Sequence, residues 1–145
     1  MALKKATRTA QTVLAAEFKW TYADTMLNVA GVEKDFGKTT VADTNAFDVI
    51  QLPPGAIVVG GEVTRDTAFD TAGYDIKVGD ATDDDRYLTE ADLKAKGTTP
   101  LVPAAFVNSD GSPIRLTIQC DDECTAGSAT LRVLYVIDGR VSEVS

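Results

Sequence analysis

Short runs of alternating apolar and polar residues are the feature that most limits how this chain can fold. In the run Glu17–Tyr22 the aromatic residues Phe18, Trp20 and Tyr22 alternate with polar residues. The same two-residue period recurs, most weakly in the first case, in Met26–Val32, Phe47–Leu52, Ala56–Arg65, Tyr74–Val78, Ile114–Cys120 and Leu131–Ile137. This period is typical of strands with one buried face, so the chain is predicted to consist mainly of β-strands.

Turn-forming residues separate these runs. Pro53, Pro54 and Gly55 follow one run directly, and proline cannot donate a hydrogen bond to a sheet. The pair Gly60 and Gly61 falls inside the longest early run, where glycine predicts a bulge or a tight bend.

Helix signals are few. The segment Thr89–Lys96 opens with a capping threonine and acidic residues and is followed by Gly97, so it predicts one short helix. The segment Thr9–Glu17 could also be helical, because it is rich in alanine.

A chain of 145 residues has the usual size of one domain. Short strands at regular spacing predict an all-β fold, for which we expect a jelly-roll-like antiparallel β-sandwich with one short helix. Residues 1–16 are predicted to form an N-terminal arm and residues 17–145 a single sandwich domain. An immunoglobulin-like sandwich is the alternative, but its usual Cys…Trp…Cys order is absent, because Trp20 precedes both cysteines.

Charge limits the possible partners. The chain has 14 basic and 22 acidic residues and a net charge of −8, which disfavours binding to nucleic acid. No apolar run reaches the roughly 20 residues of a membrane span, and the N-terminus has no secretory apolar core. The first 40 residues are mildly basic, so the arm could dock on an acidic partner or remain a solvated tail.

The chain contains no histidine, which removes histidine bases, nucleophile pairs and metal sites that depend on it. It also lacks the glycine-rich nucleotide loops and the serine nucleophile motifs. We therefore predict a protein that is not an enzyme and needs no cofactor.

Two polar clusters need separate interpretation. Cys120 and Cys124, in the sequence CDDEC, could be free thiols in a turn, a disulfide or a partial metal site, with free thiols favoured. The acidic segment Asp80–Asp85 could bind calcium, but its spacing differs from a calcium-binding loop, and an acidic surface turn is the favoured interpretation.

Residues 52–93 carry more specific motifs. These are Leu52–Val63, Thr67–Asp70, Ile76–Asp80, Asp85–Leu88 and Ala91–Leu93. Their order and spacing resemble small structural proteins of tailed-bacteriophage virions, the family that includes capsid decoration (cement) proteins. The resemblance extends over about residues 47–138.

The resemblance implies a decoration protein on the outer surface of the capsid, assembled in the host bacterial cytoplasm. It also implies the major capsid protein as partner, a homotrimer as the assembled form, and no contact with nucleic acid or membrane. A cement protein needs a rigid body and a contact surface, which agrees with the lack of catalytic motifs. The residues we expect to reach a neighbour are Lys4, Lys5, Arg8, Leu14, Phe18 and Trp20.

Two other functions fit the same sequence. The chain could be a tail, neck or head-fibre subunit of the virion, in which case hexameric rings would be expected. It could also be a receptor- or carbohydrate-binding module on the virion surface. Aromatic side chains exposed in one groove, or calcium dependence at Asp80–Asp85, would favour the binding module.

Overall fold

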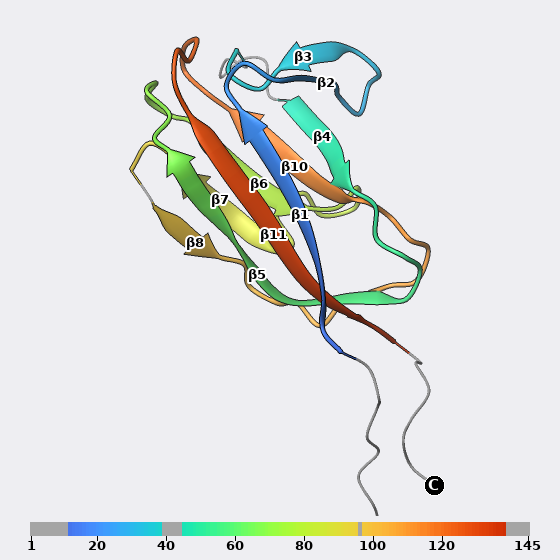
Figure 1. Ribbon diagram of the computed structural model, residues 1–145. Helices are drawn as coiled ribbons and strands as arrows, with labels where there is room; N and C mark the ends of the chain where they lie inside the picture. The colour runs from blue at the N-terminus through green and yellow to red at the C-terminus, as the bar shows by residue number, and fades with distance from the viewer. Residues whose placement is uncertain (1–11, 39–44, 96, 139–145) are drawn as a thin grey trace, which may run out of the picture.

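The computed structural model describes residues 12–38, 45–95 and 97–138, which contain eleven strands and no helix (Figure 1). The strands are β1 (Leu14–Thr21), β2 (Thr25–Leu27), β3 (Glu33–Asp35), β4 (Asn45–Ile50), β5 (Ala56–Thr67), β6 (Asp75–Gly79), β7 (Leu88–Asp92), β8 (Thr98–Pro100), β9 (Val107–Asn108), β10 (Ile114–Gln119) and β11 (Ser128–Ile137). The prediction of an all-β fold is confirmed.

Two antiparallel sheets make up most of the molecule. The first sheet has the order β1-β11-β5-β8, with β9 also paired to β5, and the second has the order β4-β10-β6-β7. Along the chain, successive strands among these eight lie in opposite sheets. The one exception is the hairpin of β6 and β7, which both lie in the second sheet. Without the short strand β9, each sheet has four strands, and their connection order is that of a jelly roll.

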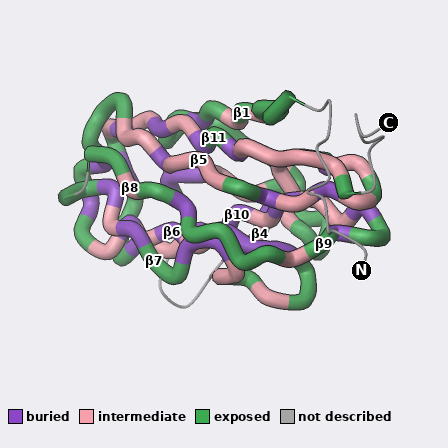
Figure 2. Tube along the Cα trace, turned by 90° about the horizontal axis from the view of Figure 1, so that it is seen from below, coloured by how far each residue is buried: buried purple, intermediate pink, exposed green. Residues whose placement is uncertain are grey.

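The two sheets face each other and enclose one apolar core (Figure 2). The first sheet contributes Trp20, Val63 and Leu131, and the second contributes Phe47 and Leu116, all of which are buried. Each strand supplies alternate residues to this core because successive side chains point to opposite faces. The alternation in the sequence therefore marks the inner faces of a sandwich.

The ends of the sandwich differ. Leu14 pairs with Tyr135, so the first and last strands enter and leave the sandwich at the same end. The hairpin of β2 and β3 lies at the other end, beside β4, where the Val29 amide donates to the Ala46 carbonyl over 2.9 Å (Figure 1).

The predicted helix over Thr89–Lys96 is wrong. Residues up to Asp92 belong to β7, which pairs with β6, and the Asp92 carboxylate then accepts the Lys94 amide at 2.9 Å in a turn. Leu88 and Ala91 are both buried although three residues apart, because the register between β6 and β7 shifts between their positions. This shift gives a strand the apolar spacing of a helix.

Two other predictions are corrected. The segment Thr9–Glu17 is strand rather than helix from Leu14 onward, so the arm boundary predicted at residue 16 falls inside β1. The predicted strand Met26–Val32 is β2 followed by a tight turn, in which the Asn28 side chain accepts the amides of Ala30 and Val32 at 2.9 and 3.0 Å.

The predicted bulge at Gly60 and Gly61 is confirmed. The pairing of β5 with β11 shifts between Leu134 and Tyr135, opposite Val58 and Gly60. At Gly61, φ is +128° and an added Cβ would lie 2.1 Å from the Arg132 carbonyl oxygen. A side chain at this position is incompatible with the close approach of the two strands.

No helix in the described part of the chain is long and apolar enough to cross a membrane.

Candidate functional site

The residues predicted to contact a partner have different positions in the structure. Lys4, Lys5 and Arg8 lie outside the described residues. Leu14 is 37% exposed at the start of β1, and Phe18 is half-buried against the core. Trp20 is only 1% exposed, so its indole ring serves the core and not the surface.

Trp20 is held by a buried hydrogen-bond chain between the two sheets. Its indole Nε1 donates to the Tyr74 hydroxyl at 3.1 Å, and that hydroxyl donates to the Phe36 carbonyl at 2.9 Å. The ring of Phe69 stacks on Tyr74 with the ring centroids 3.8 Å apart. Burial raises the pKa of Tyr74 far above its ordinary value, so the hydroxyl stays protonated and able to donate.

An apolar surface lies on the outer face of the first sheet, at the end where β1 and β11 meet the termini. We call it the apolar end patch, and its members are Val13, Ile57, Val59, Val107, Leu134 and Val136. Val136 pairs with Ile57, which pairs with Val107, so one row of the patch crosses three strands. All six side chains are exposed or half-buried. Patches of this kind mark interaction sites on soluble proteins.

A row of charges borders the apolar end patch. Arg132 on β11 lies between Glu17 on β1 and Glu62 on β5, and its guanidinium donates to each carboxylate at 2.7 Å. The hydrogen bond from Arg132, together with its charge, holds the pKa of Glu17 below the ordinary value. Glu17 and Arg132 are exposed and Glu62 is half-buried, so the row contributes little to stability.

The acidic segment Asp80–Asp85 is a structured loop. Asp80 is buried and accepts hydrogen bonds from Arg86 Nε at 2.6 Å and from the amides of Thr82 and Asp83 at 3.0 and 2.9 Å. Burial alone would raise the pKa of Asp80, but these hydrogen bonds outweigh it and hold that pKa below its ordinary value. Arg86 also lies over the Phe106 ring, 3.7 Å from its centroid.

The loop has three further carboxylates, of which Asp84 is exposed and Asp83 and Asp85 are half-buried. One oxygen from each of Asp83, Asp84 and Asp85 lies within 4.8 Å of the others, and the Lys77 ammonium is 3.7 Å from Asp84. The hydrogen bond that the protonated Asp85 carboxyl group donates to Asp83, followed by desolvation and the charges of Asp83 and Asp84, raises the pKa of Asp85. Because Asp80 is occupied by Arg86, the loop offers fewer oxygens to calcium than its sequence suggests.

Both cysteines are buried, and no disulfide joins Cys120 to Cys124. Burial, followed by the neighbouring Cys120 thiol, raises the pKa of Cys124 to about 12. A thiol in this state is a poor nucleophile and a poor metal ligand at neutral pH. Of the three interpretations, the structure agrees with free thiols and shows no disulfide.

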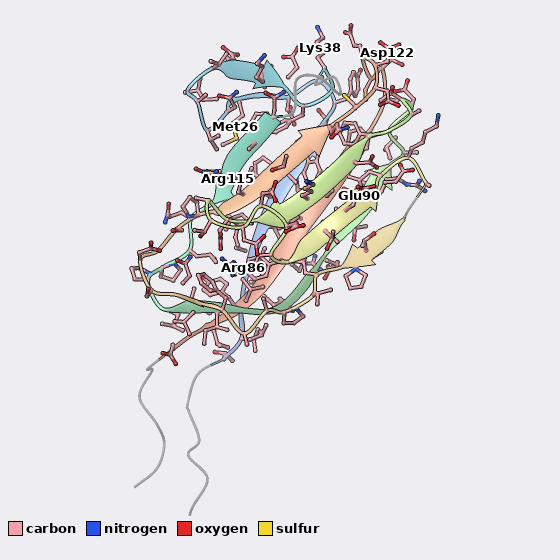
Figure 3. All side chains as sticks on the ribbon, turned by 180° about the vertical axis from the view of Figure 1, so that it is seen from behind. Met26, Lys38, Arg86, Glu90, Arg115 and Asp122 are labelled. Atoms are coloured by element: carbon pink, nitrogen blue, oxygen red, sulfur yellow. The ribbon has the colours of Figure 1, made fainter. Side chains whose placement is uncertain are left out.

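Tyr22, the residue that follows β1, has an exposed aromatic ring, whereas Trp20 is buried. It lies beside a hollow of about 250 Å³ that is lined by Tyr22, Ala23, Asp35, Lys38, Glu123 and Cys124. The Lys38 ammonium lies 3.4 Å from Asp35 and 3.3 Å from Glu123, so the charges of this hollow are already paired. Lys38 and Asp122 mark this end of the molecule in Figure 3.

No family model and no curated protein matches this sequence. Among solved structures, the chain is similar to a chain of the "Cyanophage Pam1 capsid asymmetric unit", with a TM-score of 0.61 and 21% sequence identity. The match covers 94% of this chain and 91% of that chain. At this identity the likeness shows a shared fold, and it extends over nearly the whole of both chains.

Proposed function

We propose that this protein is a structural component of a tailed-phage virion, and specifically a decoration protein that binds the outside of the major capsid protein shell. The observation that carries the proposal is the fold shared, over 94% of this chain, with a chain of a cyanophage capsid. The motifs between Leu52 and Leu93 support the same assignment independently. On this proposal the protein holds shell subunits together and catalyses no reaction.

The shape of the molecule suits this task. Its core lies between two sheets, and the hairpin of β2 and β3 lies at the end opposite the start of β1 (Figure 1), so the two surfaces to which we assign contacts are far apart. One end carries the apolar end patch, and the other carries the turn between β2 and β3. Leu27, at the end of β2, is 60% exposed, and Val29 and Val32 in the turn are 46% and 51% exposed. A protein that joins copies of itself and also grips a shell needs two such surfaces.

We assign the apolar end patch to self-association as a trimer. Copies that meet around a three-fold axis repeat the same contact on every subunit. A stable interface buries about 800 Å² on each partner, so the apolar end patch would form its centre and not its whole extent. Three linked subunits would then bind the shell at several points, which multiplies weak contacts into strong retention.

We assign the shell contact to the turn between β2 and β3, and the contact with a neighbouring subunit to the N-terminal arm. The arm carries Lys4, Lys5 and Arg8, and it joins the sandwich at Leu14, beside the apolar end patch. A basic arm would dock on an acidic surface of a neighbouring subunit. Because β1 begins at Leu14, deletion of residues 1–11 tests the arm without removing a strand.

The test is co-sedimentation with empty shells of the major capsid protein from the same phage. We expect saturable binding by the full chain and lower occupancy after deletion of residues 1–11 or after the change Leu27→Ser. The trimer is tested in parallel by light scattering after size exclusion. Val59→Glu in the apolar end patch should give monomers, whereas Val102→Glu, at a site 65% exposed outside it, should not. Full-length protein that shows no saturable binding to shells would contradict the proposal.

A carbohydrate- or receptor-binding module is the second candidate, favoured by the exposed Tyr22 beside its hollow of about 250 Å³. A glycan array followed by Tyr22→Ala tests it, and glycan binding lost in that variant would favour this function. A rise in melting temperature with millimolar calcium would further support it through Asp80–Asp85. A hexameric ring in light scattering would instead favour a tail or neck subunit.

A further inference from the structure

The outer face of the second sheet contains a buried polar group without a partner. Thr117 lies in the middle of β10 and, by alternation, points away from the core, yet it is only 6% exposed. Its hydroxyl has no hydrogen-bond partner in the described structure. Buried polar groups in proteins are nearly always hydrogen-bonded, so this hydroxyl needs an explanation.

Thr117 lines a small hollow on this face. Figure 3 shows the outer face of the second sheet, with Glu90 labelled. The hollow has a volume of about 60 Å³, and its other walls are Asp75, Lys77, Glu90 and Gln119. Lys77 and Asp75 on β6 pair directly with Thr117 and Gln119 on β10, and β7 supplies Glu90. This size excludes a sugar or nucleotide, whose sites measure roughly 300 Å³ or more.

The hollow is acidic. No lysine or arginine among the described residues is within ion-pair distance of Asp75 or Glu90, and the Lys77 ammonium is 3.7 Å from Asp84. Partial burial, followed by the charges of Glu90, Asp92 and Asp121, raises the pKa of Asp75. A positive charge placed in the hollow would relieve this repulsion.

We propose that this hollow receives the guanidinium group of an arginine side chain from a partner protein. A guanidinium has five N–H donors in a plane, and the walls offer two carboxylates, the Thr117 hydroxyl and the Gln119 amide oxygen as acceptors. Calcium would need six to eight oxygen ligands, more than this hollow supplies. Only the identity of the partner, a shell subunit, rests on the proposed function.

The experiment uses the full chain labelled with ¹⁵N and two small probes at low salt and pH 7. The probes are N-acetyl-arginine amide and N-acetyl-citrulline amide, which has nearly the same shape but no charge. We expect saturable shifts at the Gln119 side-chain amide and the Thr117 backbone amide with the arginine probe alone. Equal shifts with both probes, or none with either, would overturn the proposal.

Two variants separate a binding role from a structural one. Thr117→Val keeps the shape of the side chain and removes the unpartnered hydroxyl, so it should raise the melting temperature and weaken the arginine probe about fivefold. Thr99 has the other unpartnered buried hydroxyl of the described structure, in the first sheet, and Thr99→Val should leave probe binding unchanged. Unchanged affinity in Thr117→Val would refute the site.

The outcome is independent of the shell experiment. If wild-type protein binds the arginine probe but not the shells, the shell subunit is refuted as the partner and the arginine site is supported. Shell binding without probe binding would do the reverse. If both hold, Thr117→Val should also lower shell occupancy.

Discussion

Removing one hydroxyl from the core should cost much of the stability of this protein. Tyr74→Phe keeps the ring that stacks on Phe69 but removes the oxygen that joins Trp20 to the Phe36 carbonyl. The Trp20 indole N–H then remains buried without an acceptor, and the Phe36 carbonyl loses its donor. Each unsatisfied buried group costs about 1–3 kcal/mol, so the loss of two partners should lower the free energy of unfolding by roughly 2–6 kcal/mol.

Urea unfolding monitored by tryptophan fluorescence measures this change directly, since Trp20 is the only tryptophan. For a chain of this size, a loss of 1 kcal/mol lowers the melting temperature by about 2–4 °C. Tyr135→Phe is the matched control, because Tyr135 lies at the margin of the core and its hydroxyl makes no hydrogen bond to a residue that the structure describes, so it should cost less than about 0.5 kcal/mol.

A double-mutant cycle isolates the hydrogen bond itself. Trp20→Phe removes the donor, so Tyr74→Phe should cost less in that background than in the wild type. A loss below about 1 kcal/mol for Tyr74→Phe alone, or one equal to that of Tyr135→Phe, would refute the view that this chain of hydrogen bonds ties the two sheets together.

Gly127→Ala would place a Cβ 2.2 Å from the Phe69 ring and should destabilise the fold by about 3 kcal/mol in urea unfolding, whereas Gly97→Ala, with no heavy atom within 4 Å, should change it little. Asp75→Asn should raise the melting temperature at pH 7, because the pKa of Asp75 is raised above 3.8 in the folded state and its charged form therefore destabilises the fold. This gain should vanish below pH 3.8, where Asp75 is protonated in both the folded and the unfolded state. Cys124, with its raised pKa, should react with a disulfide reagent at pH 8 far more slowly in the native protein than in urea; equal rates would contradict its burial.

The strands that could be predicted are those in which every second residue of the sequence faces the core in the structure. In β10, Ile114, Leu116 and Ile118 face the core on every second residue, and the sequence shows this directly. In β7, the register shift places Leu88 and Ala91 in the core three residues apart, so the local pattern imitated a helix. Pairing with a strand distant in sequence overrides local propensity in such cases.

The surfaces could be predicted only in part. Trp20 was expected to face a partner, but its indole has an acceptor 54 residues away in Tyr74, which no local pattern indicates. Nothing in the sequence marks Thr117 either, since a polar residue between Leu116 and Ile118 is expected on an outer face. Its burial depends on side chains from two other strands, β6 and β7. Sites that are assembled across strands require the register, which the structure supplies.

Electron cryo-microscopy of particles formed by co-expressing this chain with the major capsid protein of its phage tests the central claim most directly. The proposed function predicts density for the sandwich on the outer surface of the shell, in groups of three, with the turn between β2 and β3 against the shell. Density at the tail or neck, or shells that carry none of this chain, would contradict the account.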